Sequence, residues 1–200
     1  LLGEVLFCGA KVDLTFRPMI PRPATEFWVK QAIEDVLHTR REYVLRSLDL
    51  FSGSGCVGLA VLKNIGEATM DFIELDPRLK EQIELSIVKN NIKKLRTRVM
   101  TGDTWQGAQG KYDVIFAVPP YVPQSMKEEV MSELSSEDPL SFFDKEDGFY
   151  FHTEVLKHAR EFLKDDGALY LEFDITQRER IEQLAREHSF TNISFFKDPY

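Results

Sequence analysis

A glycine-rich segment in the first half of the chain follows directly on an acidic residue. It reads Leu48-Asp49-Leu50-Phe51-Ser52-Gly53-Ser54-Gly55-Cys56-Val57-Gly58. Glycines at such a turn allow the backbone to approach a ligand where a Cβ would collide. A strand-like run ends at the turn and a helical pattern follows it, so the segment lies where open α/β sheets bind their ligands.

The spacing of the glycines alone leaves the ligand open. Gly53-x-Gly55-x-x-Gly58 matches the dinucleotide fingerprint, which many nucleotide-binding folds satisfy. Asp49 narrows the choice, because a carboxylate repels a pyrophosphate but suits the positively charged amino group and sulfonium of S-adenosylmethionine. The alternative is an ordinary tight turn between a strand and a helix, with no ligand.

Two more carboxylates follow the next two expected strands. Glu74 ends the second strand and is placed to accept both ribose hydroxyls of an adenosine. Asp103 follows the third strand, where a carboxylate can accept a hydrogen bond from the adenine amino group. Asp76 is the rival of Glu74, and we expect it to cap the following helix. One such carboxylate is typical of a solvated loop, but three in succession at strand ends indicate an adenosine site.

Two further motifs make a family resemblance specific. Val118-Pro119-Pro120-Tyr121 follows the fourth expected strand, and Ile20-Pro21-Arg22-Pro23-Ala24-Thr25-Glu26 precedes the first long helix. With the glycine turn and Lys145-Glu146-Asp147-Gly148, they make the chain resemble the HemK-like release-factor glutamine methyltransferases, a class I S-adenosylmethionine-dependent family. The usual family forms are Asn-Pro-Pro-Tyr and Ile-Pro-Arg-Pro-(Glu or Asp)-Thr-Glu. The resemblance runs from Gly3 almost to Tyr200 and lacks the family's N-terminal helical domain.

The resemblance implies methyl transfer from S-adenosylmethionine to the side-chain amide nitrogen of a glutamine in a peptide chain release factor, with S-adenosyl-L-homocysteine as product. It implies that the target glutamine is framed by Val118, Pro119, Pro120 and Tyr121. The cofactor contacts that we expect are Arg22, Thr25, Glu26, Asp49, Phe51, Gly53, Gly55, Glu74, Leu75, Asp103 and Thr104. No metal ion is expected.

The chain departs from this family at a position that bears on the chemistry. Val118 stands where the family has Asn, whose side chain and following backbone carbonyl accept the amide hydrogens and so direct the nitrogen lone pair at the methyl group. Valine neither donates nor accepts, and losing one polar contact at a reacting centre costs roughly 10²–10³ in rate. We expect cofactor binding to persist and catalysis to be weakened. An engineered change, drift to a non-catalytic role and a retuned substrate preference are all compatible with it.

Two other functions compete. A nucleic-acid adenine N-methyltransferase can also use Pro-Pro-Tyr, which suits stacking on a flipped base, but the net charge of −8 and the lack of a basic groove disfavour nucleic acid as a partner. A non-catalytic S-adenosylmethionine-binding protein is motivated by Val118 alone. The acidic stretch from Glu128 to Asp147 either attracts a basic release-factor surface or is merely solvated.

Alternating strand and helix patterns must position these residues. We expect strands at 47–51, 69–75, 97–101, 112–116, 168–173 and 192–196. We expect helices at 26–37, with Thr25 as N-cap, and at 57–65, 77–90, 149–162 and 177–187. Residues 119–147 lack clear periodicity, and 165–167 form a turn. The pattern predicts a doubly wound, mostly parallel α/β sheet with helices on both faces, the Rossmann-like class I methyltransferase fold, preceded by a short β-hairpin.

Composition bounds the domain organisation. With 200 residues, 43% of them hydrophobic and 29% charged, the chain suits one soluble domain with a small appendage. We divide it into 1–24, the hairpin and Ile-Pro-Arg-Pro loop, and 25–200, the S-adenosylmethionine-binding domain. It has no secretory signal or membrane-spanning run, and two cysteines without metal-like or redox-like spacing, so we expect a cytoplasmic monomer. Because the chain begins with Leu1 and stops soon after a strand-like run, we expect a fragment.

Overall fold

The fold is built around a parallel sheet. The computed structural model describes residues 3–39, 44–133, 137–197 and 199. The strands of the sheet are β3 (Arg46–Leu50), β4 (Thr69–Glu74), β5 (Thr97–Thr101), β6 (Tyr112–Ala117) and β7 (Leu163–Leu171), in the spatial order β5-β4-β3-β6-β7. All four neighbouring pairs are parallel. The order reverses between β3 and β6, which makes their carboxyl ends the switch point where such sheets bind ligands.

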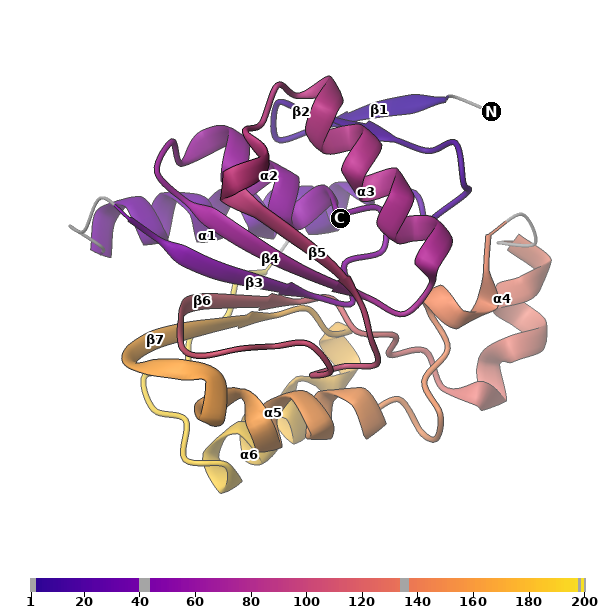
Figure 1. The fold of residues 1–200 in the computed structure, drawn as a ribbon. Coiled ribbons are helices and arrows are strands. Elements are labelled where there is room, and N and C mark those ends of the chain that lie inside the picture. The colour runs from indigo at the N-terminus through magenta and orange to yellow at the C-terminus, as the bar shows by residue number, and fades with distance from the viewer. Residues whose placement is uncertain (1–2, 40–43, 134–136, 198, 200) are drawn as a thin grey trace.

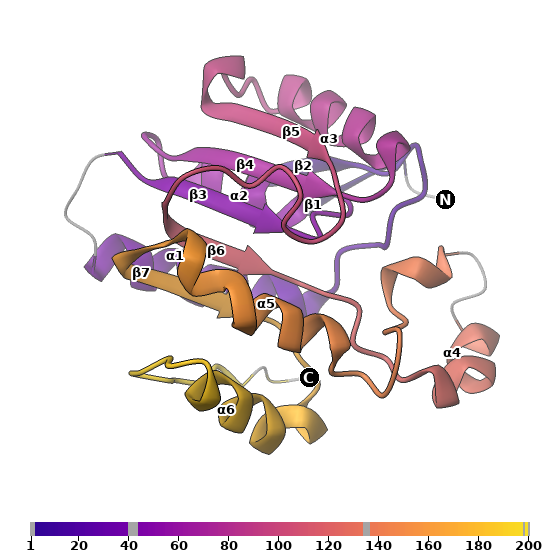
Figure 2. The same ribbon diagram turned by 60° about the horizontal axis from the view of Figure 1, so that its bottom comes forward.

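Helices cover both faces of this sheet (Figure 1). They are α1 (Pro23–Thr39), α2 (Cys56–Asn64), α3 (Pro77–Lys89), α5 (Tyr150–Phe162) and α6 (Arg178–Glu187), whereas α4 (Lys127–Glu133) lies to one side of the sheet. Apolar residues of α1, α2 and α3 form one core with β4 and β6, and α5 forms a second core with β3 and β6 on the opposite face. Figure 2 shows α6 lying outside α5, where the two helices share a smaller apolar cluster. The predicted doubly wound α/β fold is confirmed.

A two-stranded hairpin precedes the sheet, as predicted. β1 (Glu4–Phe7) pairs antiparallel with β2 (Ala10–Asp13) through a turn in which Cys8 and Gly9 have φ of 46° and 79°. Two consecutive positive φ values match the twist of hairpin strands. The hairpin packs on α3, because the backbone N–H of Lys11 donates to Asn90 Oδ1 at 2.9 Å and that of Asp13 donates to Ser86 Oγ at 3.0 Å.

Several predicted boundaries were wrong. α1 begins at Pro23 and not at residue 26, because the fixed φ of proline suits a first helical turn; Thr25 is therefore inside the helix and not its N-cap. β7 begins at Leu163 and absorbs the predicted 165–167 turn as a register irregularity opposite β6. Residues 119–147, in which the sequence shows no clear periodicity, contain α4 and short 3-10 turns at Gln124–Met126 and Pro139–Ser141.

The predicted last strand at 192–196 is absent from the described residues. These residues form no ladder with β7. Their aromatic side chains hold them instead: Phe196 stacks on Tyr170 and Phe195 meets the edge of Phe173, with ring centroids 6.4 and 6.0 Å apart. Side-chain packing has replaced backbone pairing, and the alternation of apolar residues in the sequence does not distinguish the two.

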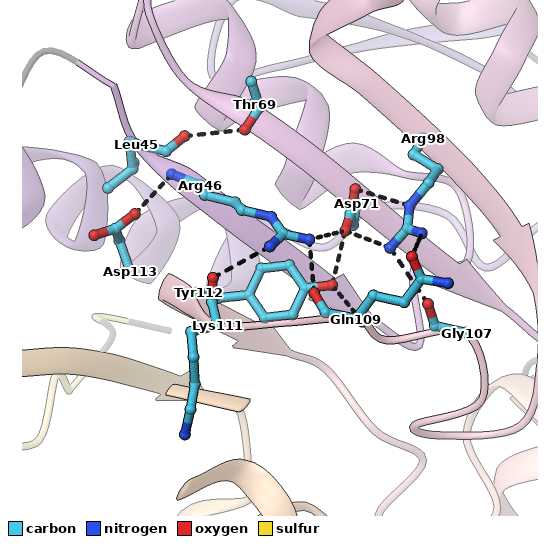
Figure 3. A network of polar contacts seen from close by, with 10 residues as sticks. All are labelled: Leu45, Arg46, Thr69, Asp71, Arg98, Gly107, Gln109, Lys111, Tyr112 and Asp113. Carbon is cyan, nitrogen blue, oxygen red and sulfur yellow. Dashed lines mark hydrogen bonds and ion pairs between the residues drawn. The ribbon is translucent and has the colours of Figure 1, made fainter. Parts of the chain in front are cut away.

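An ionic network lies over β4 on the sheet face on which α5 also packs (Figure 3). Asp71 accepts from Arg98 Nη2 at 2.7 Å, from the Tyr112 hydroxyl at 2.7 Å and from Arg46 Nη2 at 3.3 Å. Arg46 also donates to the carbonyl oxygen of Gln109 at 2.6 Å. The connection between β5 and β6 contains no helix among the described residues, so these contacts fasten a loop across the sheet where a helix would otherwise pack.

We predict that Asp71→Ala destabilises the fold by about 2 kcal/mol, because three donors lose a mostly buried acceptor; the partial exposure of both arginines keeps the loss below that of a fully buried pair. Urea unfolding followed by circular dichroism measures it. Glu182→Ala, which breaks the exposed pair with Arg186 on α6, is the control and should change the unfolding free energy by less than about 0.5 kcal/mol. Equal losses in the two variants would contradict the role of the network.

Candidate active site

The glycine turn follows β3 and has the left-handed backbone that its residue types predict. Phe51, Gly53 and Gly55 have φ of 56°, 51° and 76°. A Cβ added to Gly55 would lie 2.9 Å from Cγ1 of Ile83 on α3, so glycine is required there both by conformation and by packing. A Cβ on Gly53 would meet only the Phe51 carbonyl oxygen, at 3.9 Å, so the turn is open on that side.

Asp49 is buried beneath this turn. Its side chain accepts a hydrogen bond from the backbone N–H of Gly58 at 2.9 Å, and the residue is only 1% exposed. A Cβ on Gly58 would lie 2.3 Å from the Phe72 ring and 3.0 Å from the Asp49 carboxylate, so the third glycine lets α2 close on the sheet. Burial raises the Asp49 pKa to about 8; the Gly58 hydrogen bond opposes the rise and the nearby charge of Glu74 adds to it.

Glu74 joins the end of β4 to the glycine turn. Its carboxylate accepts from the backbone N–H of Gly53 at 2.7 Å and from that of Asp76 at 2.9 Å. Burial raises its pKa, against the effect of these hydrogen bonds. Leu75, which follows, is 56% exposed and offers an apolar surface beside the turn. Asp76 caps α3 by accepting from the Arg78 N–H, as predicted.

Asp103 and Thr104 follow β5, and Asp103 lies near Lys145 of the segment that precedes α5. The Thr104 hydroxyl donates to Asp103 at 2.9 Å, and Lys145 Nζ lies 4.0 Å from the same carboxylate. Lys145 also lies over the ring of Phe151, 5.0 Å from its centroid, and Phe151 meets Phe51 edge-on at 5.4 Å. The carboxyl ends of β3 and β5 are thus linked through Lys145 and, in the first turn of α5, Phe151.

The segment after β6 lines a pocket of about 140 Å³. Its lining residues are Met19, Arg22, Val118, Pro119, Tyr121, Val122, Ser141, Phe142 and Glu172. The pocket therefore brings together the residues predicted to frame an acceptor, apart from Pro120, which is buried beside them. Burial raises the pKa of Tyr121, and the neighbouring Glu172 carboxylate raises it further, so the phenol keeps its proton.

Glu172 is a pocket residue that the sequence analysis missed. Its carboxylate accepts from Trp28 Nε1 at 2.6 Å and from the Tyr121 hydroxyl at 3.2 Å. Its backbone carbonyl oxygen lies 2.9 Å from Nε2 of His152, a buried ring whose pKa burial lowers, so that it stays neutral. The available signal was an acidic residue at the end of an expected strand, the same signal that identified Glu74 and Asp103.

The side chains of the segment that contains Ile-Pro-Arg-Pro lie partly at the pocket and partly at the hairpin. Arg22 lines the pocket and is held by Glu137, whose Oε1 lies 2.7 Å from Nη2. Glu26 instead faces the hairpin, where it accepts from the backbone N–H of Cys8 at 2.8 Å. Thr25 is buried, and its hydroxyl has no hydrogen-bond partner among the described residues.

A metal-ligand cluster and a membrane-spanning helix are both absent from the described ranges. No group of three or more His, Cys, Asp and Glu side chains there has an arrangement that could hold a metal ion. None of the helices in the same ranges combines the length and the apolarity that crossing a membrane requires.

The chain is similar to one protein family model and to curated sequences that share one name. A family model described as "Conserved hypothetical protein 95" matches residues 13–159. The release factor glutamine methyltransferase of Streptococcus pneumoniae is 30% identical over 94% of this chain and 65% of its own length. That of Fusobacterium nucleatum is 28% identical over 99% of this chain and 55% of its length. The chain thus spans just under two thirds of the first relative and about half of the second.

Solved structures show the same fold. A methyltransferase from Pyrococcus furiosus superimposes with a TM-score of 0.63 at 19% identity, covering 92% of this chain and 80% of the other. The hMettl16 catalytic domain, solved with a MAT2A 3'UTR hairpin, gives 0.64 at 13% identity, covering 92% and 69%. Because these sequence identities are low, the likeness establishes the fold alone, which is the class I Rossmann-like methyltransferase fold.

The raised pKa of Asp49 predicts a pH-dependent stability. Unfolded, its carboxyl ionises near 3.8, whereas in the fold it keeps its proton up to about pH 8. The stability that this group contributes is complete below pH 3.8 and is lost as pH rises towards 8, with a slope of up to about 1.4 kcal/mol per pH unit. Asp49→Asn removes this decline. The unfolding free energy of the variant minus that of the wild type, measured in urea from pH 5 to 9, should therefore increase as pH rises.

Ser54→Ala, a buried non-titrating control in the same turn, should show the same dependence of unfolding free energy on pH as the wild type. If Asp49→Asn also showed the wild-type pH dependence, the burial of this carboxyl group would be contradicted.

Proposed function

Because the chain belongs to the family described as Conserved hypothetical protein 95, we propose that it is the catalytic domain of an S-adenosylmethionine-dependent methyltransferase that modifies the side-chain amide nitrogen of a glutamine in a peptide chain release factor. The observation that carries the proposal is the pocket formed by Val118, Pro119 and Tyr121 directly after β6, the strand next to the one that ends in the glycine turn. The names of the curated relatives support the acceptor.

The residues around the glycine turn fit S-adenosylmethionine as the methyl donor. Asp49 and Glu74 offer two buried carboxylates, which favour a ligand with a cationic sulfonium and ammonium over one with phosphates. Each carboxylate oxygen can accept more than one hydrogen bond, so the backbone N–H groups that hold Asp49 and Glu74 leave capacity for the amino group and the ribose hydroxyls. Leu75 and Phe51 supply apolar surface for the adenine, and Asp103 follows β5 where the adenine amino group would lie.

Val118 is the residue from which we expect a low rate of methyl transfer. It fills space in the pocket but accepts no hydrogen bond, so the amide hydrogens of a glutamine must find other acceptors. Pro119 and Pro120 still stiffen the segment, and Tyr121 is fixed by Glu172. We infer a competent but slow enzyme. The release factor would approach over the exposed acidic residues of α4, such as Glu128, which would attract a basic partner surface.

We predict that the chain binds S-adenosylmethionine and S-adenosylhomocysteine, and that Asp49→Asn weakens S-adenosylmethionine about tenfold or more, because the amide cannot balance the sulfonium and ammonium charges. The loss should be smaller for S-adenosylhomocysteine, which lacks the sulfonium. Calorimetric titration at pH 8 measures both. Ser54→Ala is the control and should bind as the wild type does. Failure of the wild type to bind either ligand would refute the proposed cofactor.

We predict that Val118→Asn raises kcat for methylation of a release factor by about 10²-fold, because it restores a hydrogen-bond acceptor for the amide. The affinity for S-adenosylhomocysteine should not change, since residue 118 faces the acceptor side of the site. Mass spectrometry of the modified glutamine measures the transfer. Val118→Leu, which restores no polar atom, is the control. Transfer by neither the wild type nor Val118→Asn, with the cofactor bound, would rule out this acceptor, and salt-sensitive RNA or DNA binding would then favour an adenine methyltransferase.

A further inference from the structure

A carboxylate lies next to the position where the family's amide side chain is missing. The backbone N–H of Glu172 donates to the Ala117 carbonyl oxygen at 3.0 Å, and Ala117 pairs with Leu171 across β6 and β7. Residues one step further along neighbouring strands share a face of the sheet. Val118 and Glu172 are therefore neighbours on the face that α1 covers, and both line the pocket.

We propose that Glu172 is the hydrogen-bond acceptor that orients the acceptor nitrogen in this chain and the group that takes its proton. The inference rests on the proposed function, since it concerns the acceptor side of the same site. Glu172 is the one carboxylate among the described residues that line the pocket. An ionised acceptor forms hydrogen bonds roughly twice as strong as those of a neutral one.

The carboxylate is held in place and retains accepting capacity. Trp28 Nε1 donates to one oxygen at 2.6 Å and the Tyr121 hydroxyl donates to the other at 3.2 Å. A carboxylate has about four lone-pair sites, so two donors leave room for an N–H from a ligand. Such a group needs no rearrangement when a substrate enters, and this is what makes electrostatic stabilisation effective in catalysis.

The other polar side chains of the pocket are less suited to this role. Arg22 can only donate, and Glu137 holds it at 2.7 Å. The hydroxyls of Ser141 and Tyr121 are neutral, and the Tyr121 hydroxyl already donates to Glu172. Val118 contributes no polar atom. The pocket thus presents one strong hydrogen-bond acceptor, Glu172. It lies beside Val118, whose side chain has no acceptor where the family has Asn.

Proton balance gives this acceptor a second use. Methyl transfer forms a bond from nitrogen to carbon and breaks the bond from carbon to sulfur, whose electron pair returns to the sulfur. The amide nitrogen then carries one hydrogen too many and must release a proton. The Glu172 carboxylate accepts it and passes it to water, so the products are an N-methyl amide, a neutral thioether and a hydrated proton.

The test compares Glu172→Gln with Trp28→Phe. Glutamine can accept from the Trp28 indole and donate to the Tyr121 oxygen, so the fold is kept, but it takes no proton. We expect kcat for release-factor methylation to fall about 10²-fold, KM to rise by no more than about tenfold, and the melting temperature to stay unchanged. Trp28→Phe keeps the carboxylate and removes one of its holders, so kcat should fall less than about tenfold. Glu172→Gln with a kcat within about threefold of the wild type would overturn the proposal.

A binding measurement separates this inference from the proposed function. Propanamide, a simple primary amide, is titrated by NMR into wild type and Glu172→Gln, both saturated with S-adenosylhomocysteine. We expect the variant to bind it about tenfold more weakly. If this difference appears although no release factor is methylated, the release-factor assignment fails and the role of Glu172 stands. Equal binding by the two proteins, or binding by neither, overturns the role of Glu172.

Discussion

The hydrogen bond from the Gly58 N–H to the buried carboxylate of Asp49 is the contact on which this architecture depends. It fixes α2 against the end of β3, and it tolerates no side chain at residue 58 because the Phe72 ring and the carboxylate occupy that space. The turn between β3 and α2 must then pass through residues with left-handed backbone conformation, and its Gly53 N–H donates a hydrogen bond to Glu74 at the end of β4. A carboxyl group that is costly to ionise is therefore kept at the centre of the sheet's binding edge.

Both sides of the site follow the same physical rule, in which a carboxylate at a strand end is oriented by donors from another element. Glu74 is held by backbone N–H groups, and Glu172 is held by an indole and a phenol. Such fixed acceptors suit ligands rich in N–H and O–H groups. The substitution at residue 118 removes polarity from one wall of the pocket, and the geometry around Tyr121 and Glu172 supplies polarity from the adjacent wall.

Sequence reasoning succeeded where the signal was local. The order of the elements followed from periodicity, the glycine turn from its composition, and the Asp76 cap from its position before Pro77. It failed where distant residues decide the outcome. The ionic contacts of Asp71 join residues up to 41 positions apart, and the apolar residues of 192–196 pack by their rings although they alternate as a strand does. Glu172 comes to lie beside Val118 only because β7 pairs with β6, and the sequence does not show this pairing.

The attachment of the hairpin to α3 has a consequence for the order of folding. Its backbone contacts with Asn90 and Ser86 join residues 79 and 73 positions apart. A two-stranded hairpin alone is at best marginally stable in water, and domains begin to form while synthesis from the N-terminus continues. The hairpin therefore leaves the ribosome before α3 and acquires the contacts with Asn90 and Ser86 only once α3 has been made. Until then, the apolar core around Phe7 and Val12 lacks the part that α3 supplies, so this segment stays more exposed to non-native contacts than the rest of the sheet's cover.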